Sequence, residues 1–361
     1  MAEVSLHSHH VALGAKLGPF GGWQMPIEYP TGTVAEHQAV RTTVGIFDVS
    51  HMGKLVVSGV GAKDFVNSVL TNDLDRIGFG QAQYSMLCND VGGIVDDLIV
   101  YLVNDREVRI VPNASNAASV ATALRVAAPS GIDVIDNHLI QGIVAIQGPS
   151  SKAVMASLGL FNDLAYMSFA DMSWNGVPVT VCRTGYTGEV GFEIVASNAA
   201  VVAIWENLLE LGNDFGLLPC GLGARDTLRT EMGYVLHGQD ISPEISPVQA
   251  RTAWAVGWAK PVFAGREALI SERAEGATRT AWGLVALERG IPRGHMMVVD
   301  TDDHVLGETT SGTFSPTLSK GIALALLVPS VQPGDQVFVD VRGRKLRCEV
   351  VRPPFVDASV N

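Results

Sequence analysis

Two adjacent carboxylates, Asp96 and Asp97, lie in an apolar, β-prone segment that directly follows the double glycine Gly92-Gly93. The surrounding β-branched and aromatic residues predict a β-hairpin whose second strand begins near Ile94. Because neighbouring side chains of a strand point to opposite faces, the two aspartates cannot act as a pair on one surface. If both faces are covered, one carboxylate lies in a partly dry environment and needs a partner or a chemical role. The alternative is that both lie near the turn in water.

A second candidate, Arg225, lies in the first turn of the helix predicted to follow Gly221-Leu222-Gly223. The positive end of the helix dipole disfavours a cation at this position. A functional role and a salt bridge to Asp226 or another neighbouring acid are both possible explanations. The buried stripe of this helix is predicted to comprise Ala224, Leu228, Met232 and Val235 or Leu236.

The segment from Gly185 to Glu193 contains too many glycines for a plain strand. It predicts a bent hairpin whose backbone a flat ligand can approach, with the Glu193 carboxylate able to accept two N–H bonds from a planar amidine-like edge. The alternative is an ordinary glycine-rich turn. Ser50 and His51 are neighbours at the start of a strand and lack the context of a nucleophile elbow, which favours packing or turn capping over catalysis.

Composition narrows the classes of partner. At 361 residues the chain is expected to form two or three domains, and its 47% apolar and 17% charged residues are typical of a well-packed globular protein. Its net charge of −12 and the absence of any basic run argue against nucleic acid as a partner. Dinucleotide-binding, Walker A and HExxH motifs are also absent. Glycoside hydrolysis by paired acids stays open on composition alone, without a motif behind it.

Cysteine and histidine usage suggests a cytoplasmic protein without a metal. The cysteines are far apart and form no CxxC or Cys/His spacing, which suits reduced, packed thiols: Cys88, Cys182, Cys220 and Cys348. The polar N-terminus lacks the apolar region of a signal peptide. Its His7, His9 and His10 have no supporting ligand, so we expect a frayed terminus there. The apolar run 322–328 is too short to span a membrane.

The expected elements alternate between strands and helices. Strands are predicted over 53–59, 83–88, 94–103, 106–111 and 140–146, a further hairpin over 177–195, and helices over 62–70, 115–128 and 199–211. The polar, small residues 271–279 are the best linker candidate. Beyond them, short strands ending in a hairpin over 336–351 predict a small all-β barrel or sandwich.

Taken in order, seven motifs resemble the aminomethyltransferase (T protein) of the glycine cleavage system, and the likeness runs from about Leu13 to Phe355. They are Phe47–Gly53, Thr71–Asp73, Gly92–Leu98, Gln147–Pro149, Arg183–Glu189, Gly223–Asp226 and Thr310–Pro316. The resemblance implies an α+β fold of three domains in a clover-leaf arrangement, with antiparallel sheets flanked by helices. Residues 1–270 would form two interleaved α+β subdomains that bind folate, and residues 280–361 a β-barrel-like domain.

The resemblance also implies a reaction. The aminomethyl group carried on the dihydrolipoyl arm of the lipoylated H protein would pass to tetrahydrofolate as cosubstrate, giving 5,10-methylenetetrahydrofolate, ammonia and dihydrolipoyl H protein. The second aspartate of the family's pair matches Asp97 and carries the catalytic role. Folate-binding residues carry over to Met52, Tyr84, Asn113, Glu193, Arg225 and Arg293, with Tyr101 and Tyr186 as wall residues.

The chain departs from the family pattern at two positions. Gln249 stands where many members have Glu, and Val360 stands where some members place a Tyr or Arg against the folate. The main alternative is a non-catalytic folate-binding relative that assists iron–sulfur cluster assembly. Those relatives carry a Lys-Gly-Cys-Tyr-x-Gly-Gln-Glu type motif that this chain lacks. Flavin-linked demethylating dehydrogenases need a dinucleotide-binding domain, for which there is no fingerprint here. A purely structural module would leave Asp97, Glu193 and Arg225 solvated and apart.

Overall fold

The computed structural model describes residues 1–357 and residue 359, so Val360 lies outside the described residues. The chain divides into two compact units. The first comprises Met1–Ser85, Asp97–Arg225 and Ser359, and the second comprises Met86–Asp96 and residues 226–357. The chain therefore passes between units within two strands, β6 (Gln81–Cys88) and β7 (Ile94–Asn104), and within a helix, α7 (Leu222–Met232).

The first unit is built on three sheets, with strand orders β1-β3-β2, β11-β12-β13-β10-β4-β14 and β6-β7-β8-β5-β9. Strands β6 and β7 extend into the second unit. The bounds are β1 Ala2–Glu3, β2 Lys16–Phe20, β3 Trp23–Glu28, β4 Val44–Asp48, β5 Leu55–Gly59, β6 Gln81–Cys88, β8 Glu107–Pro112, β9 Ile132–Asp136, β10 Gln141–Gln147, β11 Phe169–Trp174, β12 Val177–Cys182, β13 Gly191–Ser197 and β14 Leu217–Pro219.

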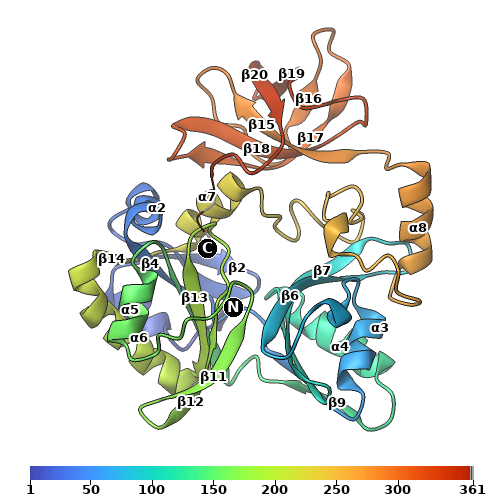
Figure 1. The fold of residues 1–361 in the computed structure, drawn as a ribbon. Coiled ribbons are helices and arrows are strands. Elements are labelled where there is room, and N and C mark those ends of the chain that lie inside the picture. The colour runs from blue at the N-terminus through green and yellow to red at the C-terminus, as the bar shows by residue number, and fades with distance from the viewer. Residues whose placement is uncertain (358, 360–361) are drawn as a thin grey trace. The chain divides into compact units, whose positions relative to one another are not determined.

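Helices cover the two larger sheets of this unit (Figure 1). Helices α5 and α6 pack on the six-stranded sheet, and α3 and α4 pack on the five-stranded sheet. Central strand β10 is buried from its second residue to its last, because both of its faces are covered; this explains its continuous apolar run. The helices are α1 His7–Ala12, α2 Thr33–Thr42, α3 Ala62–Val69, α4 Ala117–Ala127, α5 Ser151–Ser157 and α6 Asn198–Gly212.

The five-stranded and six-stranded sheets touch each other inside the first unit. Tyr101 of β7 packs edge-on against Phe169 of β11, with 5.4 Å between ring centroids. Ala82 and Cys182 complete this small buried cluster. Tyr101 is thus held by packing, and its hydroxyl has a fixed direction.

The second unit contains a closed barrel with strand order β15-β18-β17-β16-β19-β20. Its interior is filled by alternating apolar side chains such as Leu284, Val339 and Leu346. The barrel strands are β15 Thr280–Ala286, β16 Met297–Val299, β17 Val305–Ser315, β18 Lys320–Leu327, β19 Gln336–Val341 and β20 Arg344–Val351, and the unit also contains helix α8 (Arg266–Glu275). The predicted α+β class with a C-terminal barrel is confirmed.

Hydroxyl groups of β17 tie the barrel to the second-unit part of α7. Ser315 donates to Glu231 Oε1 at 2.5 Å, and Ser311 Oγ lies 2.8 Å from Arg229 Nη2. Arg229 also donates to Asp240 at 2.6 Å, and both side chains are almost fully buried. The motif Thr310–Pro316 therefore has a structural role within this unit.

Three predictions about local structure are wrong. The N-terminus is ordered rather than frayed, because His10 is completely buried and lies 2.9 Å from both Asp48 Oδ2 and the Tyr29 hydroxyl. Residues 271–275 of the expected linker belong to α8, which buried Leu269 anchors. Helix α7 ends at Met232 and does not reach 235, because Gly233 takes a left-handed conformation (φ +69°).

Within the described residues, no helix is both long enough and apolar enough to cross a membrane.

Candidate functional site

The hairpin that carries the aspartate doublet has the predicted form. Strand β7 begins at Ile94, and the turn before it is closed by Asn89, whose side-chain oxygen accepts the backbone N–H groups of Val91 and Gly93. A Cβ at position 93 would lie 1.7 Å from the carbonyl oxygen of Pro243, so only glycine fits there. The turn therefore fixes where β7 starts and which face each aspartate takes.

The two aspartates take opposite faces of β7, as predicted. Asp96 is completely buried, whereas Asp97 is half-buried. The drier of the two is thus the first aspartate of the doublet, and Asp97 keeps some access to solvent.

Asp97 is held by one donor from each neighbouring strand. The Asn113 side chain, just after β8, donates to Asp97 Oδ1 at 2.7 Å and to the Asp97 backbone carbonyl at 2.9 Å. The Tyr84 hydroxyl of β6 donates to Asp97 Oδ2 at 3.0 Å. Because β7 lies between β6 and β8, both oxygens of the carboxylate are oriented. An oriented, half-buried carboxylate can accept a further proton or hydrogen bond from a ligand.

A second group of site residues surrounds Glu193 of β13. Thr184 Oγ1 donates to Glu193 Oε2, and the Tyr101 hydroxyl lies 3.5 Å from Thr184 Oγ1. Burial raises the pKa of Tyr101 well above its usual value, with the Cys182 thiol and Glu193 acting in the same direction, so the phenol stays neutral. Among the described residues, Glu193 Oε1 accepts no hydrogen bond, and it remains available to a ligand.

Arg225 lies in the first turn of α7 and stacks on an aromatic ring instead of pairing with Asp226. Its guanidinium carbon lies 4.6 Å from the centre of the Tyr186 ring. Burial lowers the pKa of Arg225, while the negative charge of Glu193 opposes that shift, so the guanidinium remains charged. Asp226 pairs with Arg229. The unusual cation at this helix start is therefore explained by Tyr186 and Glu193.

These two groups are connected through β7. Asp97 and Tyr101 are four residues apart and so lie on the same face of the strand, separated by about 13 Å at the usual rise per residue. Met52 is half-buried in the turn after β4. Arg293 belongs to the second unit, where it is exposed and its Nη1 lies 3.4 Å from the Gly312 carbonyl oxygen.

The glycines of the 185–193 hairpin serve a different purpose from the one expected. The side chain of Gln147, from β10, lies under the hairpin, and Cβ atoms at Gly185 and Gly191 would come within 2.1 and 2.3 Å of it. Gln147 accepts from Thr187 at 2.9 Å and donates to the Thr184 carbonyl at 3.2 Å. These two glycines therefore make room for Gln147, which in turn fixes Thr184.

The role of Thr184 is not predictable from the sequence. It lies in the Arg183–Glu189 motif, where a hydroxyl in a glycine-rich turn carries no specific signal. The predicted packing role of Ser50 is supported: its hydroxyl accepts the backbone N–H of Ile143 at 3.0 Å. His51 is buried, and burial lowers its pKa to about 3, which suits a neutral packed imidazole.

The fold combines α+β subdomains with a C-terminal barrel, and its site holds a half-buried carboxylate oriented by two donors. With these features the chain matches known enzymes over nearly its whole length. The family models "GCVT N-terminal domain" and "Glycine cleavage T-protein C-terminal barrel domain" match residues 6–260 and 279–357. The chain is 60% identical over 355 residues to the aminomethyltransferase of Parafrankia sp. (98% of this chain, 97% of the relative), and 54% identical over 353 residues to that of Mycobacterium avium (97% and 96%).

A solved structure is similar over almost the entire fold. The glycine cleavage system aminomethyltransferase T from Bartonella henselae superposes with a TM-score of 0.94 at 34% identity, covering 99% of each chain. The chain belongs to the aminomethyltransferase (glycine cleavage T protein) family, and it is an enzyme of that class.

Proposed function

We propose that the protein transfers the aminomethyl carbon from the dihydrolipoyl arm of the H protein to tetrahydrofolate. In the balanced reaction, the carbon leaves the arm's sulfur, which regains a proton as a thiol. The carbon bridges two nitrogens of the folate as 5,10-methylenetetrahydrofolate, and its amino group leaves as ammonia. Family membership supports this reaction, and the single structural observation that carries it is the orientation of the Asp97 carboxylate by Tyr84 and Asn113.

The residues present fit a reduced pterin. Glu193 has an oxygen free to accept from an amino and amide edge, and neutral Tyr101 and the stacked Tyr186–Arg225 pair offer apolar and aromatic surface beside it. The site thus combines a flat, mostly apolar wall with a few convergent polar groups. Met52 and Arg293 remain predicted folate contacts.

Asp97 would act at the other end of this surface. Its carboxylate accepts a hydrogen bond from the nucleophilic amine and so increases the electron density on that nitrogen. It then takes up and returns the protons that move as ammonia leaves and the ring closes. Asn113 and Tyr84 keep both carboxylate oxygens in place during these proton movements.

The burial of the chain's thiols argues against the alternative function in iron–sulfur cluster assembly. All four cysteines are unpaired and buried, so none offers the accessible sulfur on which the iron–sulfur assembly relatives depend. Unpaired thiols also suit a reducing compartment, and we propose the cytoplasm as the location.

The decisive measurement is ammonia release from aminomethylated H protein, with and without tetrahydrofolate, by the wild type and by Asp97→Asn. The amide of the variant can still accept from Asn113, and the Tyr84 hydroxyl can turn to accept from its NH₂ group, so the local geometry is retained. We expect turnover to fall by ~10²–10⁴-fold, the usual contribution of a general acid or base, while folate affinity changes only a few-fold.

Asp133→Asn, an exposed aspartate of β9, is the matched control and is expected to behave as the wild type. Wild-type turnover in Asp97→Asn would remove Asp97 from the mechanism. Folate binding by the wild type without any folate-dependent ammonia release would instead favour the assembly-factor function.

A further inference from the structure

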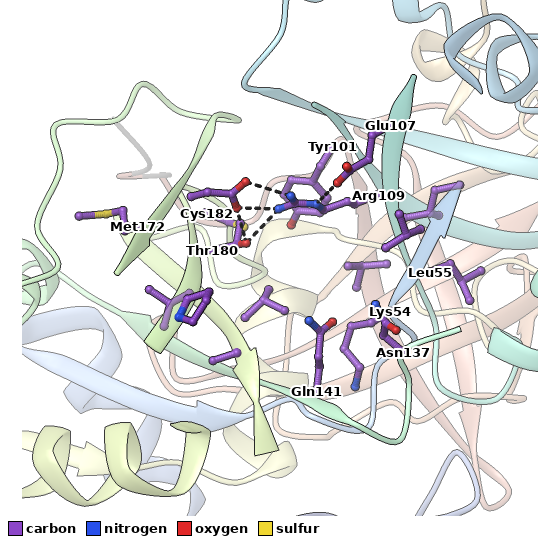
Figure 2. Close-up of a pocket in the computed structure, with 18 residues that line it drawn as sticks. Lys54, Leu55, Tyr101, Glu107, Arg109, Asn137, Gln141, Met172, Thr180 and Cys182 are labelled. Atoms are coloured by element: carbon purple, nitrogen blue, oxygen red, sulfur yellow. Dashed lines mark hydrogen bonds and ion pairs between the residues drawn. The ribbon is translucent and has the colours of Figure 1, made fainter. Parts of the chain in front are cut away.

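The first unit contains a cavity of about 420 Å³ that lies outside the proposed folate site except at Tyr101. It lies between the five-stranded and six-stranded sheets, lined by residues of β5, β7 and β8 on one side and of β11, β12 and β13 on the other (Figure 2). Of the predicted site residues, Tyr101 alone lies on its lining within the described chain. Its volume is in the range that holds small molecules in proteins.

At one polar end of the cavity, the Arg109 guanidinium already donates hydrogen bonds to neighbouring side chains. Arg109 donates to Glu107 at 2.9 Å, to the two carboxylate oxygens of Asp171 at 2.7 and 2.9 Å, and to the Thr180 hydroxyl at 3.0 Å. With one guanidinium and two carboxylates, this group keeps a net negative charge. This end of the cavity therefore disfavours the anionic group of a ligand.

The opposite end contains the ammonium group of Lys54, which has N–H donors not used within the described chain. Lys54 is only 4% exposed, and within the described chain its ammonium makes one hydrogen bond, to the Ser50 carbonyl at 2.7 Å. An ammonium has three N–H donors, so two are left. Asn137 and Gln141 line the same end of the cavity (Figure 2), and their side-chain amides make no hydrogen bond to the described residues.

Between the two ends the walls are apolar. They are lined by residues of both sheets, among them Val56 and Val111 on one side and Pro178 and Val195 on the other. An ammonium and two carboxamides at one end of an apolar chamber are complementary to a single carboxylate attached to an apolar body. Phosphates and dicarboxylates carry more charge than this single available cation can neutralise.

We propose that this cavity is a second ligand site, distinct from the Asp97 site, which binds a small monocarboxylate with an apolar body. The carboxylate accepts from Lys54, Asn137 and Gln141, and the body lies between the sheets toward Tyr101. The proposal does not depend on the transfer reaction.

The test is a calorimetric titration of the full chain with phenylacetate, and with phenylacetamide as its uncharged counterpart. We expect phenylacetate to bind and phenylacetamide to bind about 10–100-fold more weakly, because the latter lacks the charge-assisted hydrogen bonds to Lys54. Lys54→Met is expected to weaken phenylacetate binding by a similar factor. Lys152→Met, which removes an exposed lysine of α5, is the matched control and should leave binding unchanged.

Val56→Phe tests the location without touching a charge, because the larger ring occupies the apolar part of the cavity. It should abolish phenylacetate binding. The proposal is overturned if the wild type binds no phenylacetate at millimolar concentration, if the acid and the amide bind equally, or if Val56→Phe binds as the wild type does.

Discussion

Lys54 gives the sharpest test of the electrostatics of the first unit. Burial lowers its pKa from 10.5 to about 8, against the opposing attraction of Asp48 and Asp136. Between those two values the unfolded chain holds a proton that the folded chain has lost, so the free energy of unfolding rises with pH through this window. Below it, both states are charged and the folded state bears the full cost of the buried ammonium, about 3 kcal/mol at 1.36 kcal/mol per pH unit.

The perturbation is Lys54→Met, which removes the titrating group but keeps most of the side chain's volume. Between pH 7 and pH 10 we expect the wild type to gain about 2–3 kcal/mol of stability relative to the variant, whatever the offset at pH 7. Urea denaturation of both proteins at each pH measures this difference, and Lys152→Met provides an exposed control. A stability difference independent of pH would refute the assignment of a desolvated ammonium to the cavity wall.

Two further predictions concern buried polar groups. His51→Phe removes an imidazole whose pKa is lowered by burial to about 3. Between pH 6.5 and pH 4, the free energy of unfolding of the wild type should therefore fall by about 3 kcal/mol more than that of the variant, as measured by urea denaturation. Parallel acid profiles would contradict this. Asp240→Ala leaves the buried Arg229 guanidinium without its buried carboxylate and should lower the free energy of unfolding by about 3–5 kcal/mol. Asp226→Ala removes the more exposed carboxylate and should lower it by under about 1 kcal/mol. Equal losses would refute the reasoning.

Local signals in the sequence were sufficient for most elements. The Asn89–Gly93 turn, the helix of small residues at 117–127 and the barrel hairpin around Arg342-Gly343 all have side chains whose intrinsic preferences agree with the final structure. The opposite faces of Asp96 and Asp97 followed from strand geometry alone. The class of protein followed from the order of the motifs.

Long-range contacts account for what sequence reasoning could not supply. The burial of His10 depends on Asp48 and Tyr29, and nothing near the N-terminus indicates those partners. The glycines at 185 and 191 predicted a ligand site, because their actual neighbour, Gln147, lies more than 35 residues earlier in the chain. The cavity beside Lys54 is formed by strands from two sheets, and no single segment carries its pattern.

The turn before β7 also has a consequence for how the protein is made. Asn89 donates to the Pro243 carbonyl at 3.0 Å, across 154 residues of chain. At a synthesis rate of ~5–20 residues per second, this loop leaves the ribosome roughly 8–30 s before its partner exists. The nascent chain must therefore carry this β-hairpin without its Pro243 contact while 154 further residues are added, and a molecule released before residue 243 lacks that carbonyl.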